Sequence, residues 1–162
     1  MCKVTGSEDP PQEYLVFRLA EGCYAISAAS VVQIFRAVKI NPFPKAPRVI
    51  EGVINLRGQI VPVLDIRSRF NHQPKSVAAS DRFIVAKAKG RLVALRVDST
   101  IAVEMLAPAD IEPADTLGSG IAYIAGVVPR PDGVMLIHDL DGFLTEAEQQ
   151  SLADLDSAET AA

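Results

Sequence analysis

The 162-residue sequence has no tryptophan, and only 6% of its residues are aromatic. Its 16 basic side chains are outnumbered by 20 acidic ones, which gives a net charge of −4. Proteins that bind nucleic acids need a cationic surface and aromatic rings on which bases stack. The composition therefore disfavours a nucleic-acid-binding protein.

Long apolar segments are also missing. No apolar run approaches the roughly 18 residues of a transmembrane helix, and residues 1–12 lack the apolar stretch of a signal peptide. We therefore expect a cytoplasmic protein. Cys2 and Cys23 are the only cysteines, which is too few for a disulfide scaffold.

The familiar catalytic motifs are absent as well: the chain has no GxSxG, no Gly-rich phosphate loop, no HExxH and no CxxC. His72 lies in a polar segment. His138 precedes Asp139, whose side chain points to the opposite face if both belong to a strand. Cys23 follows a turn and has no neighbour in sequence that would lower its thiol pKa. We therefore predict no enzymatic activity, no metal site and no cofactor.

Two aspartates, Asp65 and Asp139, each end an apolar run at matching places in the chain. They are candidates for a general acid–base pair. At the end of a strand, however, an aspartate more often accepts hydrogen bonds from nearby backbone N–H groups. We favour this structural role for both residues.

What the sequence does contain is the pattern of an all-β protein. β-branched apolar runs alternate with turn residues, which predicts short strands joined by hairpins. Residues 27–35 are ambiguous between a short helix and a strand, and the prolines at 42, 44 and 47 predict an extended loop. Four hairpin turns are expected, at Glu21-Gly22, Arg57-Gly58, Lys89-Gly90 and Pro131-Asp132-Gly133.

We divide the chain into three parts. Residues 1–12 are polar and predicted to be a flexible tail, residues 13–144 form the folded domain, and residues 145–162 form a C-terminal helix and tail. The helix is predicted from Thr145 and Glu148, which have the spacing of a capping box. Polar segments at 71–80 and 107–120 are expected to be connecting loops.

A weak internal repeat is the strongest indication of the architecture. Residues 14–26 align with residues 82–94 at an offset of 68, and residues 52–66 align with residues 126–140 at an offset of 74. Each copy contains about five short strands, enough to curl into a small barrel without exposed sheet edges. We therefore predict two small five-stranded barrels, with the repeat boundary near residues 71–80. Chance similarity between two β units with glycine turns is the alternative.

The segment Asn55-Leu56-Arg57-Gly58 is the most distinctive surface feature. Gly58 permits a tight turn, which places Arg57 at the tip of a hairpin between two apolar strands. A guanidinium offers five donors in a rigid fork that suits a carboxylate on a partner. An arginine that merely aids solubility is the alternative interpretation.

The same region resembles the CheW family of chemotaxis coupling proteins. The resemblance extends from about residue 12 to the C-terminus. The spacing of NLRGxxVPVxD to the upstream INPFP is specific. The segments that carry it are YLVFRLAEGCYAIS (14–27), INPFPKAPRVIEG (40–52), GVINLRGQIVPVLDIRSRF (52–70), GRLVALRVDSTIAVEML (90–106) and GVMLIHDLDGFL (133–144).

This resemblance implies an all-β fold of two small five-stranded SH3-like barrels, with a short C-terminal helix, and an adaptor without enzymatic activity. Members of the family link the cytoplasmic tips of methyl-accepting chemoreceptors to the regulatory domain of the histidine kinase CheA. They work in receptor arrays at the membrane without inserting into it. No nucleic acid is implied as a partner.

The resemblance also implies which residues bind these partners. Arg57 matches the family's functionally sensitive arginine at the receptor-facing groove, on a hairpin that Asn55, Leu56 and Gly58 shape. Apolar positions near the same groove complete the predicted receptor- and kinase-binding site: Val31, Val32, Val97 and Val103.

The chain departs from the family pattern at one position. Where the family usually reads V-Q-E-I, this chain has Gln33 in place of the glutamate. Gln33 can accept a hydrogen bond from Arg57 but cannot form an ion pair with it. An exposed ion pair is worth only about 0–1 kcal/mol, so we expect no effect on the fold. We hypothesise that partner choice differs, and that the chain serves a specialised chemosensory pathway rather than flagellar chemotaxis.

Two other functions are compatible with a small β-barrel. A hydrolase would need a nucleophile and a base brought together in a pocket, for example Cys23 with a histidine. A nucleic-acid-binding barrel would need a cationic surface, and the acidic balance of the chain speaks against one.

Overall fold

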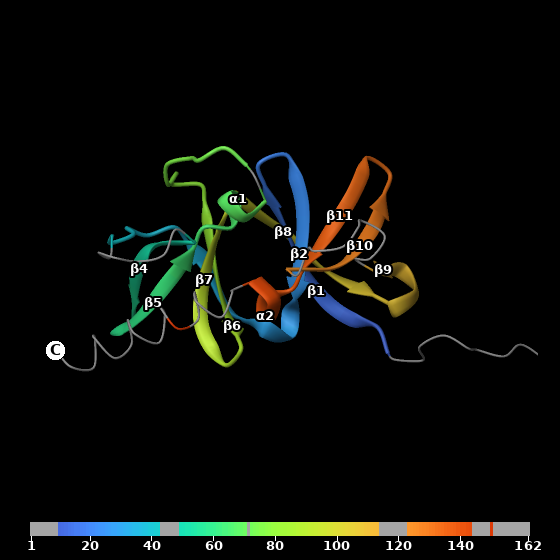
Figure 1. Ribbon diagram of the computed structural model, residues 1–162, viewed down its shortest axis with the longest axis horizontal. Coiled ribbons are helices and arrows are strands. Elements are labelled where there is room, and N and C mark those ends of the chain that lie inside the picture. Colours follow the sequence, from blue (N-terminus) through green and yellow to red (C-terminus); the bar gives the residue numbers. More distant parts are fainter. Residues whose placement is uncertain (1–9, 43–48, 71, 114–122, 144–149, 151–162) are drawn as a thin grey trace, which may run out of the picture.

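The computed structural model describes residues 10–42, 49–70, 72–113, 123–143 and 150. Within these ranges the chain forms two curled β-sheets that lie side by side (Figure 1), one of five strands and one of six. The prediction of an all-β fold is confirmed. None of the helices in the described ranges is long and apolar enough to cross a membrane.

The secondary-structure elements are short. The five-stranded sheet consists of β3 (Val31–Arg36), β4 (Ile50–Leu56), β5 (Gln59–Leu64), β6 (Arg82–Ala88) and β7 (Arg91–Val97). The six-stranded sheet consists of β1 (Gln12–Leu19), β2 (Gly22–Ser27), β8 (Ser99–Leu106), β9 (Glu112–Pro113), β10 (Ile124–Arg130) and β11 (Gly133–His138). The helical turns are η1 (Ala28–Ser30), α1 (Ile66–Arg69), η2 (Pro108–Asp110) and α2 (Leu140–Phe143).

The two sheets repeat one strand order. The orders are β3-β6-β7-β5-β4 and β8-β1-β2-β11-β10-β9. Strands at the same place in the two orders come from matching segments of the two copies of the repeat. Only the two-residue β9 has no counterpart. The pairs β5–β7 and β2–β11 are both parallel. The register shifts between Ile50 and Gly52 in β4, and between Ile124 and Gly126 in β10, which are the matching places. The topology confirms the predicted repeat.

Each sheet nevertheless contains strands from both copies. The hairpin β1–β2 pairs with β8 and β11, and the hairpin β6–β7 pairs with β3 and β5. The connector at 72–80 therefore does not divide the chain into one sheet before it and one sheet after it. Each sheet contains strands that precede the connector in the sequence and strands that follow it. This exchange of hairpins makes the sheets one interlocked unit.

Most of the predicted local structure is present. All four hairpins form, and residues 27–35 resolve into η1 followed by β3. β1 begins at Gln12, so the last residue of the predicted tail belongs to a sheet. The chain after His138 turns into α2 instead of continuing as a strand, and α1 was not expected either. Helices of four residues are too short to leave a periodic apolar pattern in a sequence.

Several predictions lie outside the described residues. They concern Thr145 and Glu148 of the capping box, the prolines at 44 and 47, and residues 114–120 of the acidic loop. The beginning of that loop is described, and it forms η2 and β9.

Three apolar clusters hold the fold together. One, with Ile54 and Phe83, fills the interior of the five-stranded sheet, and another, with Val16 and Met135, fills the interior of the six-stranded sheet. The largest, the central cluster, contains buried side chains of both sheets, among them Phe17 and the other inward-facing residues of β1, β2, β6 and β7. Because these four strands are covered on both faces, they read as nearly continuous apolar runs.

Candidate functional site

The β4–β5 turn presents Arg57 at the surface. Arg57 and Gly58 have φ values of 53° and 86°, as in the two-residue turns that suit the twist of a hairpin. The Asn55 Oδ1 atom accepts a hydrogen bond from the Gly58 backbone N–H at 2.7 Å. Leu56 packs against the apolar cluster of the five-stranded sheet. The hairpin is thus anchored by Leu56 and closed by Asn55, which leaves the arginine exposed.

The Arg57 side chain is not engaged by the rest of the described chain. No ion pair or hydrogen bond to its guanidinium occurs among the described residues, and none joins it to Gln33. Its five donors are therefore available to a carboxylate from outside. The hydrogen bond between Gln33 and Arg57 that the sequence allowed is not formed.

Strand β3 forms the outer edge of the five-stranded sheet and exposes apolar side chains. It pairs only with β6, and its burial alternates along the strand. Val32 is 52% exposed and Ile34 is 40% exposed, while Val31 packs against the central cluster and Gln33 is half-buried. An edge strand also offers unpaired backbone groups to a partner. Ile34 was not predicted from the sequence, although it lies two residues from Val32 and so shares its face.

Strand β8 provides a second exposed apolar edge, on the six-stranded sheet. Ile101, Val103 and Met105 are 49%, 54% and 59% exposed, and they alternate along one face of a strand that pairs only with β1. Of these three residues only Val103 was predicted. The alternation of Ile101, Val103 and Met105 in the sequence places the three on one face, but it does not show that this face is exposed.

Val97 needs a correction. It is fully buried at the end of β7, in the central cluster between the sheets. A side chain without exposed surface cannot contact a partner directly. Any contribution of Val97 to a binding surface is indirect, through its packing against the strands from the central cluster.

The candidate catalytic residues have structural partners. Asp65 caps α1, because its Oδ1 atom accepts from the Ser68 backbone N–H at 3.2 Å, and Asp139 accepts from the backbone N–H of Asp141 at 3.1 Å. Both aspartates thus have the structural role that we favoured. Cys23 is half-buried, and burial raises the pKa of its thiol, which keeps it protonated at neutral pH.

His72 and His138 have very different surroundings. The Nε2 atom of His72 shares a hydrogen bond with the Tyr24 hydroxyl, 2.7 Å away. His138 is buried next to aromatic rings. No group of three or more residues suited to hold a metal ion occurs in the described ranges.

Charged side chains hold the connector 72–80 against the five-stranded sheet, since Arg96 donates to the Lys75 carbonyl at 2.7 Å and the Lys75 ammonium lies 3.4 Å from Asp81. The Arg96 guanidinium in β7 donates to the Glu51 carboxylate, with N–O distances of 3.0 to 3.2 Å, and to Asp81 at 3.2 Å. Burial raises the pKa of Glu51, although the hydrogen bond and charge of Arg96 act in the opposite direction. Since these charges are paired within the chain, we assign them to the fold.

Asp98 ties the two sheets together. It lies between β7 of one sheet and β8 of the other, and its carboxylate accepts from the Ala20 backbone N–H at 2.7 Å and pairs with Arg67 of α1. Burial by itself would raise the pKa of Asp98, but the Ala20 N–H and the Arg67 guanidinium lower it below its usual value. The ionised form of Asp98 therefore stabilises the junction.

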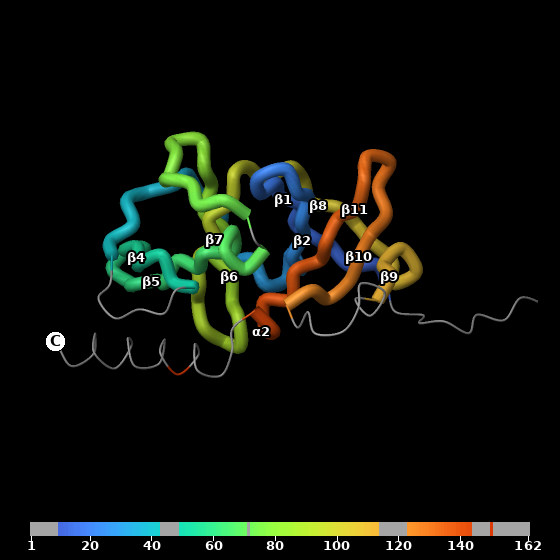
Figure 2. Tube along the Cα trace, turned by 45° about the horizontal axis from the view of Figure 1, so that its top comes forward, coloured from blue at the N-terminus to red at the C-terminus, as the bar shows by residue number. Residues whose placement is uncertain are grey.

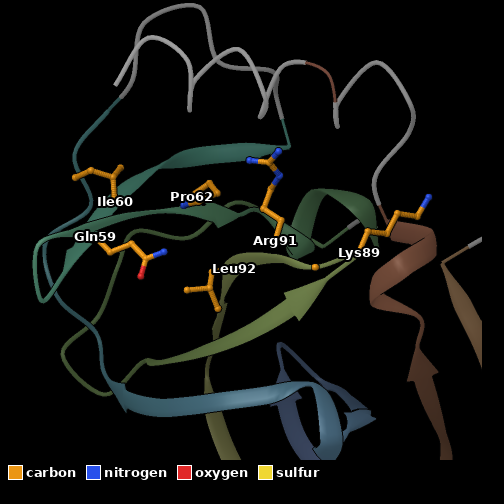
Figure 3. Close-up of a pocket in the computed structure, with 7 residues that line it drawn as sticks. Gln59, Ile60, Pro62, Lys89, Arg91 and Leu92 are labelled. Atoms are coloured by element: carbon orange, nitrogen blue, oxygen red, sulfur yellow. The ribbon is translucent and has the colours of Figure 1, made fainter. Parts of the chain in front are cut away.

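A shallow pocket of about 360 Å³ lies between the β4–β5 and β6–β7 hairpins (Figure 3). In Figure 3 the side chain of Lys89 points away from Gln59 and Leu92. The described residues of the lining include no nucleophile with a neighbouring base. The residues that line it are Gln59, Ile60, Pro62, Lys89, Gly90, Arg91 and Leu92.

Comparisons with known proteins agree with one another. A family model described as "CheW-like domain" matches residues 13–148. The chain is 30% identical to "Chemotaxis protein CheW" of Klebsiella aerogenes over 95% of this chain and 93% of that protein. It is 27% identical to "Protein FrzA" of Myxococcus xanthus over 89% of this chain and 92% of that protein. The crystal structure of the scaffolding protein TtCheW from Thermoanaerobacter tengcongensis matches with a TM-score of 0.76 and 29% identity, covering 85% of this chain and 95% of that one.

Proposed function

The chain belongs to the CheW-like domain family, and on this premise we propose that it couples methyl-accepting chemoreceptors to a CheA-type histidine kinase. It is a non-enzymatic adaptor. The family match spans the strands of both sheets apart from Gln12, the first residue of β1. The observation that carries the proposal furthest is the presence of two exposed apolar edges, β3 and β8, one on each sheet.

An adaptor needs two surfaces held in a fixed relation, and the interlocked sheets provide them. We take β3 and the β4–β5 hairpin of the five-stranded sheet as the first surface, with Val32 and Ile34 as its exposed apolar residues and Arg57 as its exposed cation. The second surface is β8 with Ile101, Val103 and Met105. Apolar centres with a polar rim are the usual anatomy of a protein interface. Edge strands add backbone groups that can pair with a strand of the partner.

We assign the predicted site residues to these surfaces. Arg57 binds a carboxylate of the receptor or the kinase, and Asn55, Leu56 and Gly58 hold its hairpin in shape. Val32 contributes to the same surface, Gln33 lies beside it in β3 with a half-buried side chain, and Val31 supports the surface from the core side. Val103 belongs to the second surface. Through its partners the chain is placed at the cytoplasmic side of a receptor array.

Gln33 supports the further proposal of a specialised chemosensory pathway. The family's usual glutamate would hold the arginine in an ion pair, whereas Arg57 here forms no ion pair within the described chain. A receptor carboxylate could then bind Arg57 without displacing a carboxylate of the chain itself. A receptor that relies on the internal pair for orientation would bind less well. Receptors from a flagellar and a non-flagellar cluster of the same organism, compared side by side, distinguish the two cases.

The adaptor role is tested by a three-part reconstitution. A receptor tip fragment is immobilised, and the regulatory domain of the kinase from the same organism is passed over it with and without this chain. We expect the kinase domain to be retained only when the chain is present. Retention that does not depend on the chain contradicts the adaptor role.

Three valine variants locate the surfaces in the same assay. Val32→Glu in β3 and Val103→Glu in β8 should each reduce retention by roughly tenfold or more, because a charge is expensive to bury in an apolar interface. Val77→Glu is the matched control, since Val77 is 44% exposed in the connector and lies outside both surfaces. Equal losses in all three variants contradict the assignment of β3 and β8.

A further inference from the structure

His138, the last residue of β11, is a buried polar side chain that forms no hydrogen bond within the described part of the chain. It is 3% exposed, and neither its Nδ1 nor its Nε2 atom has a hydrogen-bond partner in the described ranges. The imidazole packs edge-on against two rings, Phe143 at 4.8 Å and Phe70 at 5.4 Å between centroids. Buried polar groups are nearly always hydrogen-bonded, since an unpaired one costs free energy.

The repeat shows that this position does not need a polar residue. Leu64, the last residue of β5, is the counterpart of His138 at the offset of 74, and it is fully buried in the central cluster. The helices that follow, α1 and α2, correspond at the same offset. A leucine therefore satisfies the same architecture in the other copy.

His138 lies where the two sheets meet. Phe143 belongs to α2, and Phe70 follows α1 and stacks on Tyr24 of β2 at 4.6 Å. In both views α2 lies between the sheets (Figure 1, Figure 2). Phe143 and Tyr24 are members of the central cluster. The imidazole thus packs at the edge of the central cluster, which joins the two sheets.

The surroundings oppose a positive charge on the imidazole. Burial is the main cause and the Arg69 guanidinium the second, and together they lower the pKa of His138 from 6.5 to about 3. Arg69 lies over the Phe143 ring, 4.9 Å from its centroid. The other titratable groups on the surrounding elements have partners of their own: the Tyr24 hydroxyl with His72, the Tyr123 hydroxyl with the Arg69 carbonyl, Asp139 with the Asp141 N–H, and Asp141 with the Lys89 N–H.

The direction of the pH effect follows from the difference between the pKa of an exposed imidazole, 6.5, and that of the buried His138 imidazole, about 3. Above about pH 6.5 the imidazole is neutral in both the folded and the unfolded chain, and the junction has its full stability. Between pH 6.5 and about 3 an exposed imidazole takes up a proton that the closed junction does not accept. Stability is therefore lost as the pH falls through this range.

We propose that His138 is an acid-sensitive latch, and that uptake of a proton by its imidazole opens the junction of α1, α2 and β11. The latch is a property of the chain alone. Because β3 and β8 belong to different sheets, opening also changes how the two partner surfaces are held. That consequence rests on the proposed adaptor function, whereas the latch can be measured without any partner.

Native-state hydrogen exchange of the isolated chain at pH 7 and pH 5 tests the latch. The pKa values of 6.5 and about 3 predict that the opening constant of the amides in α1, α2 and the end of β11 rises roughly twentyfold between these pH values. His138→Leu, which matches the other copy of the repeat, should abolish the rise. His72→Gln is the control, since His72 is the only other histidine, and it should keep the rise.

An equal rise in the wild type and in His138→Leu overturns the proposal, and so does a rise that disappears in His72→Gln. If His138→Leu does not fold, NMR titration of the wild-type imidazoles decides. A His138 resonance that remains neutral at pH 5 supports the latch. A resonance that titrates between pH 6 and pH 7 overturns it.

Discussion

The two sheets have the same strand order, but their matching hairpin tips differ in chemistry. The β4–β5 turn carries Arg57, exposed and without an ion pair among the described residues, where the β10–β11 turn carries Pro131. The residue before the tip also differs. Leu56 packs into the five-stranded sheet, whereas its counterpart Arg130 pairs with Glu104 of β8 at 2.8 Å. The free hairpin arginine thus occurs in one copy only.

This difference separates what the fold requires from what the function requires. Positions that both copies share, such as Gly52 and Gly126, serve strand pairing and close packing. Positions at which the copies depart from each other include Arg57 and His138, the residues to which we assign binding and acid sensitivity. Other departures serve the fold, as Leu56 and Arg130 do, so a departure identifies a candidate for function only where the fold gives the side chain no partner among the described residues.

The largest effect on stability is expected at the junction of the sheets. Asp98→Ala should lower the free energy of unfolding by about 3 kcal/mol, because Arg67, which is 5% exposed, loses its partner. Glu104→Ala, which breaks the half-exposed pair with Arg130, should cost less than about 1 kcal/mol. Urea denaturation of the two variants measures the difference. Similar losses would contradict the special place of Asp98 between the sheets.

A smaller effect is expected where both copies need glycine. A Cβ atom at Gly52 would lie 2.5 Å from the backbone oxygen of Asn41, and one at Gly126 would lie 2.4 Å from the Cγ2 atom of Ile111. Since a side chain yields more easily than backbone, Gly52→Ala should cost about 2 kcal/mol and Gly126→Ala about 1 kcal/mol. Thermal unfolding of both variants tests this order. A larger loss for Gly126→Ala than for Gly52→Ala would contradict the described packing around these two glycines.

Acid should affect the junction through Asp98 as well. Because the pKa of Asp98 is lowered in the folded chain, its stabilisation is present above the pKa of an unfolded aspartate, near 3.9, and is lost as the pH falls below it. Asp98→Asn should therefore lose less stability between pH 5 and pH 3 than the wild type does. Asp132→Asn, in the exposed β10–β11 turn, serves as the control and should follow the wild type. An Asp98→Asn curve parallel to the wild type would contradict the assignment.

The smallest effect on stability is expected at Gln33. Gln33→Glu restores the glutamate that the family usually has here, and a surface ion pair is worth only about 0–1 kcal/mol, so the melting temperature should hardly change. Binding to a receptor tip should change in preference between receptors, and the change should fade at high salt. Titrations at low and high salt measure it. A binding preference identical to the wild type at both salt concentrations would remove the basis for a specialised pathway.

Much of the fold could be predicted from the sequence, because its signals are local. Gly22, Gly58 and Gly90 mark three hairpin turns, and the repeat predicts a duplicated strand order. The exchange of hairpins could not be predicted, since β1–β2 would satisfy its apolar pattern in either sheet. α1 and α2 were missed because four residues do not show a helical period.

The candidate site could be predicted in part. The turn that exposes Arg57 could be predicted because the residues around it have strong conformational preferences, whereas the binding role of Arg57 stays a prediction. Val97 was misplaced because a strand that is covered on both faces does not reveal which apolar residues reach the surface. The apolar edge of β8 was mostly missed for the opposite reason. Its exposed Ile101 and Met105 have the composition of a core strand, and only the sheet order identifies β8 as an edge.

The most direct test compares two hairpin tips of the same sheet. Lys89 and Gly90 have φ values of 52° and 79°, close to those of Arg57 and Gly58, and Lys89 is likewise an exposed cation. The dissociation constant of a receptor tip or kinase regulatory domain is measured for Arg57→Glu and Lys89→Glu, together with both melting curves. We predict a rise of roughly tenfold or more for Arg57→Glu alone, with nearly unchanged melting temperatures. Unchanged binding by a folded Arg57→Glu protein, or equal losses in both variants, would contradict the assignment of partner binding to Arg57.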